Sequence, residues 1–155
     1  MLRKKIINKQ KNIYYVEDYL VYLRQTGIVQ THFARKNMLI VESVNAEKKR
    51  FPAYGNEKII SLADIAMYTD DAEVPLYEVL EAIKEKEKSA AASIDPKKAT
   101  PEQLREYLAE VLPNFDRERV YVADIKKLVS WYNILVANGI TEFKPEEAKE
   151  ETVTE

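Results

Sequence analysis

Apolar and polar positions divide this chain into a first part that predicts short strands and a second part that predicts helices. The run at 38–41 is apolar and partly β-branched, and polar residues bound it on both sides. A short run with such flanks is typical of a buried strand. A second apolar run at 51–54 follows a polar connection, so the two runs predict a hairpin. Pro52 cannot donate a ladder hydrogen bond, which places this second strand at a sheet edge or at a bulge.

Further short apolar runs flank this hairpin. Those at 58–62 and 65–68 predict two more strands, and the segment 28–33 predicts a strand that leads into the central one. Several short strands with close turns are typical of a small, strongly bent antiparallel sheet or barrel. Residues 12–25 have apolar side chains at the i, i+3, i+4, i+7 spacing instead, which predicts an amphipathic helix.

The second part repeats that helical spacing three times. The first helix is expected at 75–88, where Pro75 stands at a position that needs no N–H donor. The next begins at Thr100, which can cap the helix while Gln103 completes a capping box. The third runs from about residue 122 to 137 and carries enough apolar side chains to be largely buried.

Together these patterns predict an α+β protein in which a small antiparallel β domain precedes a helical domain. The expected parts are a separate N-terminal segment at 1–35, a β domain at 36–72, a linking helix and connector at 73–98, a helical domain at 99–143 and a tail at 144–155. The tail holds five glutamates and no packing residues, so we expect it to be disordered.

Composition narrows the class of protein. The chain has 155 residues, a net charge of −2 and no cysteine, so disulfides and thiolate metal sites are ruled out. Its charge is uneven, because residues 1–34 carry six Lys and Arg against two Asp and Glu, while residues 35–155 carry 18 against 24. No apolar run approaches the roughly 18 residues of a membrane span, and the N-terminus lacks the apolar core of a signal peptide. A cytoplasmic protein without a membrane partner is expected.

Candidate chemistry is sparse. His32 is the single histidine, and the sequence has no phosphate-binding glycine loop and no metalloprotease motif. Asp70, Asp71 and Glu73 suit a hard cation, but the spacing of a calcium loop is missing, and a turn that ends a strand explains them more simply. We therefore expect no catalytic residue, no metal and no cofactor.

A few side chains offer a charge or a large aromatic surface to a partner: Lys48, Lys49, Arg50, Arg117, Arg119 and Trp131. The three cations at the expected hairpin tip suit phosphate, although three charges on an exposed turn are more often simply solvated, which is the preferred interpretation. The two arginines of the 114–119 loop suit an anion, with local ion pairs as the plainer interpretation. Trp131 falls off the main apolar stripe of its helix, so it lines a second contact surface or is a partly covered core residue.

Seven motifs in fixed order carry a resemblance. They are NMLIVES, RFPAY, SLADIAMYT, EVPLYEVL, ASIDPKKA, LPNFDRERVY and DIKKLVSWYN, all within residues 36–143. Together they resemble a bacterial family catalogued only as a domain of unknown function. The resemblance implies a small SH3-like β domain followed by a helical domain, with no assigned activity and no functional residues to transfer.

Residues 1–35 depart from that family, whose members carry a segment similar to KIILSISGKPGLYKLISQG before the NMLIVES motif. When the codons of residues 17–35 are read one nucleotide later, every position is compatible with that segment. An adenine run in the codons of residues 35–37 would let the two frames rejoin. The resemblance therefore implies that residues 1–35 are translated out of frame, that they pack poorly, and that the barrel lacks its first hairpin.

The leading expectation for function is a non-enzymatic, cytoplasmic protein-interaction module, because the acidic balance of residues 35–155 favours a protein partner over nucleic acid. The alternative is an RNA- or ribosome-associated protein that binds through its basic hairpin, with an affinity that falls steeply with salt. An enzyme that uses carboxylates only is a third, less favoured hypothesis. The sequence does not fix the oligomeric state.

Overall fold

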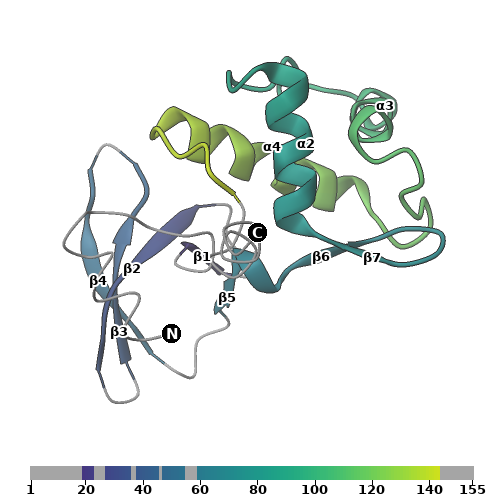
Figure 1. Ribbon diagram of the computed structural model, residues 1–155. Helices are drawn as coiled ribbons and strands as arrows, with labels where there is room; N and C mark the ends of the chain where they lie inside the picture. Colours follow the sequence, from purple (N-terminus) through teal and green to yellow (C-terminus); the bar gives the residue numbers. More distant parts are fainter. Residues whose placement is uncertain (1–18, 23–26, 36–37, 46, 55–58, 144–155) are drawn as a thin grey trace, which may run out of the picture.

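An antiparallel sheet forms the first half of the computed structural model, which describes residues 19–22, 27–35, 38–45, 47–54 and 59–143 (Figure 1). Its strands are β1 (Tyr19–Tyr22), β2 (Ile28–Arg35), β3 (Met38–Ser43), β4 (Arg50–Tyr54) and β5 (Ile59–Ser61). The spatial order is β4-β3-β2-β1-β5, so four strands form a meander and the fifth returns to pair with the first. The predicted hairpin of β3 and β4 is confirmed, and β4 lies at the end of the sheet, as Pro52 indicates.

Strand β1 corrects two expectations. The helix predicted at 12–25 is wrong at Tyr19–Tyr22, which pair with β2 and β5. The expectation that residues 1–35 pack poorly is wrong for Tyr19, Val21 and Ile28, each at most 4% exposed, and a first hairpin of β1 and β2 is present. The segment is rich in residues that favour strands. Its alternate side chains pack into a hydrophobic cluster on each face of the sheet, so tertiary packing overrides the helical spacing. Residues 1–18 lie outside the described part, and the reading frame of the gene stays a prediction.

A short connection leads from the sheet to the helices. It consists of a 3-10 helix (Leu62–Asp64) and a two-stranded sheet of β6 (Ala66–Tyr68) and β7 (Glu73–Pro75). The sequence indicated β6 but not β7, and the acidic residues at 70–71 form the turn between them. In that turn the Thr69 hydroxyl donates to Asp71 at 3.1 Å, which supports the interpretation as a turn that ends a strand.

Three helices follow: α2 (Leu76–Glu87), α3 (Pro101–Val111) and α4 (Val122–Ala137). All three match the predicted ranges within a few residues. The capping box at Thr100 is confirmed, since its hydroxyl accepts from the Gln103 N–H at 3.2 Å and the Gln103 side chain accepts from the Thr100 N–H at 2.9 Å. None of the described helices is long and apolar enough to cross a membrane.

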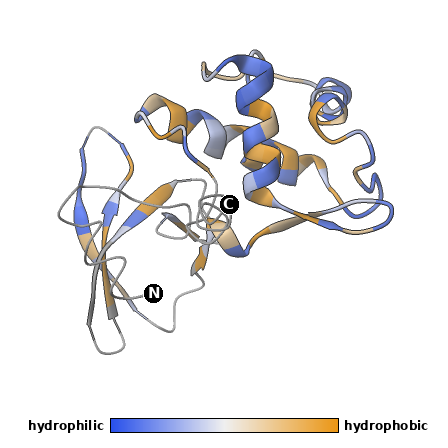
Figure 2. Ribbon diagram, in the orientation of Figure 1, coloured by the Kyte–Doolittle hydropathy of each residue, from blue (hydrophilic) through white to orange (hydrophobic). Residues whose placement is uncertain are grey.

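One hydrophobic core joins the sheet and the helices. Tyr19 and Val21 of β1 face the buried side chains of all three helices, while Leu20 between them belongs to a small second cluster inside the sheet. This alternation follows from the two-residue period of a strand. The apolar faces of the helices turn inward toward one another in Figure 2. The predicted α+β class is confirmed. Helix α2, which was expected only to link two parts, also buries Leu80 and Ile83 completely in the shared core.

Candidate functional site

The basic hairpin between β3 and β4 presents its cations to solvent. Lys48, Lys49 and Arg50 are all exposed, and Lys48 adopts a positive φ of 48°. Arg50 Nε donates to Glu42 Oε1 at 3.0 Å, and Glu47 stands beside the lysines on the same turn. One of the three cations is therefore paired on its own hairpin, which reduces the local positive potential that a phosphate would meet.

The two arginines of the 114–119 loop are held by their own chain. Arg119 Nε donates to Asp116 Oδ2 at 2.7 Å, and its guanidinium lies 4.3 Å from the ring centroid of Tyr68. Arg117 lies over Phe115 and donates to its carbonyl oxygen. The bond from Arg119 holds the pKa of Asp116 below its usual value and raises the pKa of Arg119. The interpretation as local pairs is supported, with stacking on aromatic rings as an addition.

Trp131 is buried, with 8% of its surface exposed. It lies in α4 beside the main stripe of the helix, as its position in the sequence indicated, and it borders a pocket. Its indole Nε1 has no hydrogen-bond acceptor among the described residues. Arg119 borders the same pocket, whereas Lys48 borders a different hollow, so the structure brings together two of the six candidate contacts and separates the hairpin from them.

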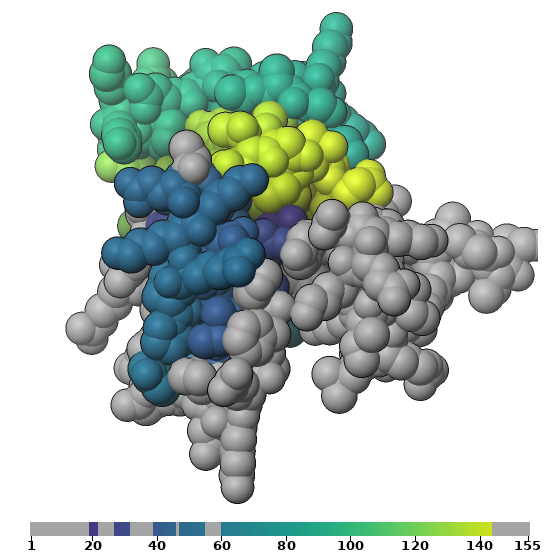
Figure 3. Space-filling model, turned by 90° about the vertical axis from the view of Figure 1, so that its left-hand side faces the viewer, coloured from purple at the N-terminus to yellow at the C-terminus, as the bar shows by residue number. Residues whose placement is uncertain are grey.

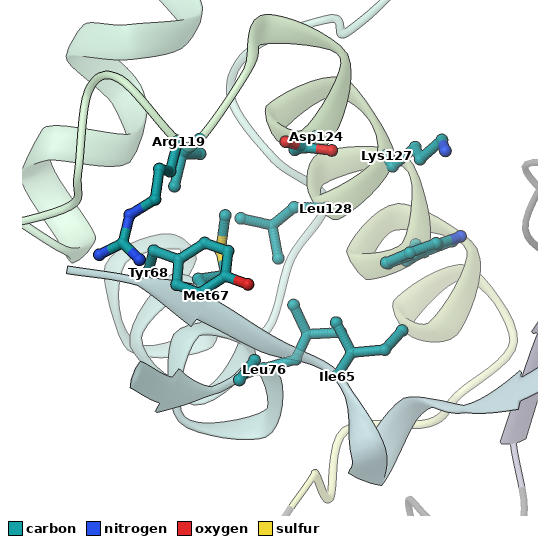
Figure 4. A pocket seen from close by; sticks show the side chains of 11 residues that line it. Ile65, Met67, Tyr68, Leu76, Arg119, Asp124, Lys127 and Leu128 are labelled. Atoms are coloured by element: carbon teal, nitrogen blue, oxygen red, sulfur yellow. The ribbon is translucent and has the colours of Figure 1, made fainter. Parts of the chain in front are cut away.

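The shared pocket has a volume of about 190 Å³ and lies between β6 and the first half of α4 (Figure 4). Its floor is apolar, and its border carries one aromatic and three charged side chains. The floor includes Ile65, Met67, Leu76, Val120, Leu128 and Trp131, and the border includes Tyr68, Arg119, Asp124 and Lys127. In Figure 4 Arg119 lies beside Tyr68 on one side, and Lys127 lies on the α4 side.

Local sequence rules position these groups. Met67 is buried while its neighbours in β6, Ala66 and Tyr68, are exposed, as the strand period requires. Asp124 stands in the first turn of α4 and accepts the Tyr121 N–H at 2.9 Å, so its carboxylate caps the helix. Lys127 follows one turn later on α4. The cations and the apolar floor thus come from two stretches, 65–76 and 119–131, that lie far apart in the sequence.

The pocket is too small for a cofactor-sized ligand, because sites for such molecules usually measure about 300–1,000 Å³. It suits a single side chain. Two larger hollows, of about 580 and 420 Å³, have more polar linings. The larger one lies where the residues after α4 meet the β3–β4 hairpin, shown in yellow and blue in Figure 3, and Asn138 reaches the Val44 carbonyl oxygen there at 3.5 Å.

Glu87 illustrates a structural role for a carboxylate in the described part of the chain, because its hydrogen-bond donors belong to the fold itself. Glu87 Oε2 accepts from the Tyr107 hydroxyl at 2.6 Å and from the N–H and hydroxyl of Ser93 at 2.8 Å each. No group of three or more potential metal ligands occurs among the described residues. His32 lies in β2, and its side chain falls outside the described residues, as does the acidic tail at 144–155.

Comparison with known proteins places the chain in a family. Residues 65–135 match the model "Domain of unknown function (DUF6852)". A solution NMR structure of a protein from Bacteroides vulgatus, a structural genomics target, is 61% identical, with 83% of this chain and 90% of that chain covered and a TM-score of 0.69. The chain belongs to this bacterial family of unknown function. No curated protein matches it.

This match confirms the resemblance that the motifs indicated. The range matched by the DUF6852 model also contains every residue that lines the pocket, since these residues run from Ile65 to Trp131. Sequence reasoning found Arg119 and Trp131 but missed Ile65, Met67 and Lys127. The signal for Ile65 and Met67 was the alternating stretch at 65–68, which predicted a strand without revealing that a helix some 55 residues later would cover one face of it. Lys127 lies on that helix, and its spacing alone did not indicate which element it would face.

Proposed function

We propose that this chain is a non-enzymatic, cytoplasmic protein-interaction module that binds a partner by taking one apolar side chain into the pocket between β6 and α4. The observation that supports this most is a side-chain-sized apolar hollow with charged residues on its border. Interfaces gain most of their affinity from a few anchors of this kind, surrounded by polar contacts that exclude water. Tyr68 and Tyr121 are 40% and 67% exposed, and Tyr68 borders the pocket, which adds apolar contact area around its mouth.

The sheet edge is a weaker candidate for the same role. Strand β4 ends the sheet among the described strands, but Pro52 stands in its middle and is exposed. A strand added at this edge would meet no N–H donor at Pro52, and prolines of this kind protect natural sheet edges from such pairing. The partner is therefore expected at the pocket rather than at β4.

The RNA alternative rests on Lys48, Lys49 and Arg50. Because Glu42 pairs with Arg50 and Glu47 stands beside the lysines, the geometry of the hairpin adds little to it. Capture from lysate with and without nuclease separates the two hypotheses. Partners that persist after nuclease treatment and in high salt support the protein-binding proposal, and nuclease-sensitive capture supports the alternative.

A display library of random peptides tests the proposal directly. We expect enriched peptides to share an apolar residue and to lose binding to Ala66→Tyr, because Ala66 is exposed on β6 and a large side chain there would occupy the mouth of the pocket. Ala137→Tyr is the matched control, since Ala137 is exposed near the end of α4 and does not line the pocket. Peptides that bind both variants as well as the wild type would refute the pocket as the site.

A further inference from the structure

The C-terminal end of α4 carries the one Asn-Gly pair of the sequence, Asn138 and Gly139. Such a pair is chemically reactive, because the backbone nitrogen of the glycine can attack the side-chain amide of the asparagine, and glycine has no Cβ to obstruct the approach. Both residues are exposed, and a Cβ added to Gly139 would meet nothing within 4 Å, so solvent reaches the pair. The pair lies outside the pocket between β6 and α4 and is independent of the proposed function.

The fold holds the pair in a conformation that does not react. The Gly139 N–H donates to the Val136 carbonyl oxygen at 3.0 Å, and the Ile140 N–H donates to the Leu135 carbonyl oxygen at 2.9 Å. With Gly139 at a φ of 78°, these two bonds form a Schellman cap. Asn138 has a ψ of 16°, which turns the Gly139 nitrogen away from the Asn138 side chain. Ring closure therefore requires the peptide between the two residues to rotate and the cap to open.

Asn138 also connects the helix to the sheet. Its Nδ2 donates to the Ile134 carbonyl oxygen at 2.7 Å and lies 3.5 Å from the carbonyl oxygen of Val44, which follows β3 and is buried in the shared core. A carboxylate at this position would have no donor for either carbonyl oxygen and would place a negative charge against both. Lys48 borders the same hollow, but an exposed ammonium offers only a surface ion pair, which is worth little.

We propose that Asn138 is a site of spontaneous deamidation gated by the Schellman cap, and that the product loosens the junction between α4 and the sheet. In the open cap, the Gly139 nitrogen loses its proton to hydroxide and bonds to Cγ of Asn138, while the Cγ–Nδ2 bond breaks and ammonia leaves. Water then opens the cyclic imide at either carbonyl carbon and gives aspartate or isoaspartate. Nothing is oxidised or reduced, and the net reaction consumes one water and releases one ammonia.

Peptide mass spectrometry of the full chain measures the rate, because replacement of the amide by a carboxyl group raises the mass of the peptide that contains Asn138. Samples are kept at pH 8 either folded or unfolded in guanidinium chloride. Opening the cap breaks at least two hydrogen bonds, so we expect conversion in the folded chain to be at least about tenfold slower than in the unfolded chain. Equal rates would overturn the gate, and absence of conversion in the unfolded chain would overturn the site.

Ile140→Ala and Ile94→Ala distinguish opening of the cap from unfolding of the whole chain. Both isoleucines are partly buried against the shared core. Ile140 stands at the position whose side chain packs back on the helix in a Schellman motif, whereas Ile94 lies in the connector before α3. We expect Ile140→Ala to speed conversion several-fold in the folded chain and to leave the unfolded rate unchanged. The gate is wrong if Ile140→Ala gives no acceleration, or if Ile94→Ala accelerates conversion as much, since the reaction would then follow global unfolding.

Asn138→Asp and Asn138→Ala test the effect of the product. Both remove the side-chain donor, and only the aspartate adds the charge. Hydrogen exchange of the Ile140 amide reports how often the cap opens. We expect exchange to be faster in Asn138→Ala than in the wild type, and faster again in Asn138→Asp. Equal exchange in the two variants would refute the role of the carboxylate, and exchange as slow as in the wild type would refute the loosening altogether.

Discussion

The carboxylate of Glu87 connects helix α2, the connector after it and helix α3, and its hydrogen bonds can be tested one at a time. Tyr107→Phe removes the hydroxyl that donates to Glu87 Oε2 at 2.6 Å. It keeps the ring, which is 5% exposed and has the Lys86 ammonium 5.3 Å from its centroid. The two donors from Ser93 also remain. The variant therefore isolates one charge-assisted hydrogen bond with little change in packing.

A hydrogen bond to a charged group contributes about 1.5–3 kcal/mol to the free energy of unfolding, so we expect a loss of about 2 kcal/mol at pH 7. In a protein of this size, each kcal/mol corresponds to about 2–4 °C in Tm, which gives a decrease of roughly 4–8 °C. Urea unfolding followed by Trp131 fluorescence measures the loss. Tyr54→Phe is the control, because Tyr54 is 50% exposed on strand β4 and should change stability little.

The pH dependence provides a second criterion. Burial acts to raise the pKa of Glu87, but the hydrogen bonds from Tyr107 and Ser93 together lower it below its ordinary value. A carboxyl group with a depressed folded pKa stabilises the fold above its unfolded pKa, about 4.3, and loses that contribution as pH falls through the folded pKa. The difference between wild type and Tyr107→Phe should be constant from pH 6 to 8 and shrink below about pH 4. A difference under about 0.5 kcal/mol at pH 7, or one that grows in acid, would refute the reasoning.

Four further predictions concern the caps, the edge strand and the gene. Thr100→Ala should lower stability by about 0.5–2 kcal/mol in urea unfolding, because it removes the side-chain half of the capping box, and Thr100→Ser should restore most of it. Gly139→Ala should cost about 1–2 kcal/mol in the same assay, since Gly139 has a φ of 78° and only backbone strain opposes the added methyl group. Pro52→Thr should increase self-association in sedimentation velocity, because it adds an N–H donor to an end strand. Resequencing the gene across the codons of residues 34–38 should reveal an extra adenine if residues 1–35 are out of frame, and a clean read would reject that hypothesis.

Local sequence signals fixed the second half of the fold well. The ranges of the three helices and the capping box at Thr100 follow from spacing and cap chemistry. These features depend on contacts within a few residues, so a pattern in the sequence is sufficient to predict them. The hairpin of β3 and β4 belongs to the same class, because a short polar turn joins two apolar runs.

The N-terminal strands show where such signals fail. The apolar spacing at 12–25 is helical, yet Tyr19–Tyr22 form a strand between β2 and β5. Its partner strand β5 lies about 40 residues later in the chain, and a local sequence pattern carries no information about a pairing over that separation. Strand propensity depends on the neighbours that a side chain meets, so the sheet decided the conformation of this segment.

The pocket illustrates the same division at the level of function. From the sequence, Arg119 was one cation of a charged loop and Trp131 an aromatic residue beside the stripe of its helix. The structure places both beside Met67 and Leu76, which lie more than 40 residues earlier in the chain. The sequence determined the helices, the capping box at Thr100 and the charge of each residue. Only tertiary packing decided which of these charges would surround an apolar hollow, because that depends on how β6 meets α4 across the shared core.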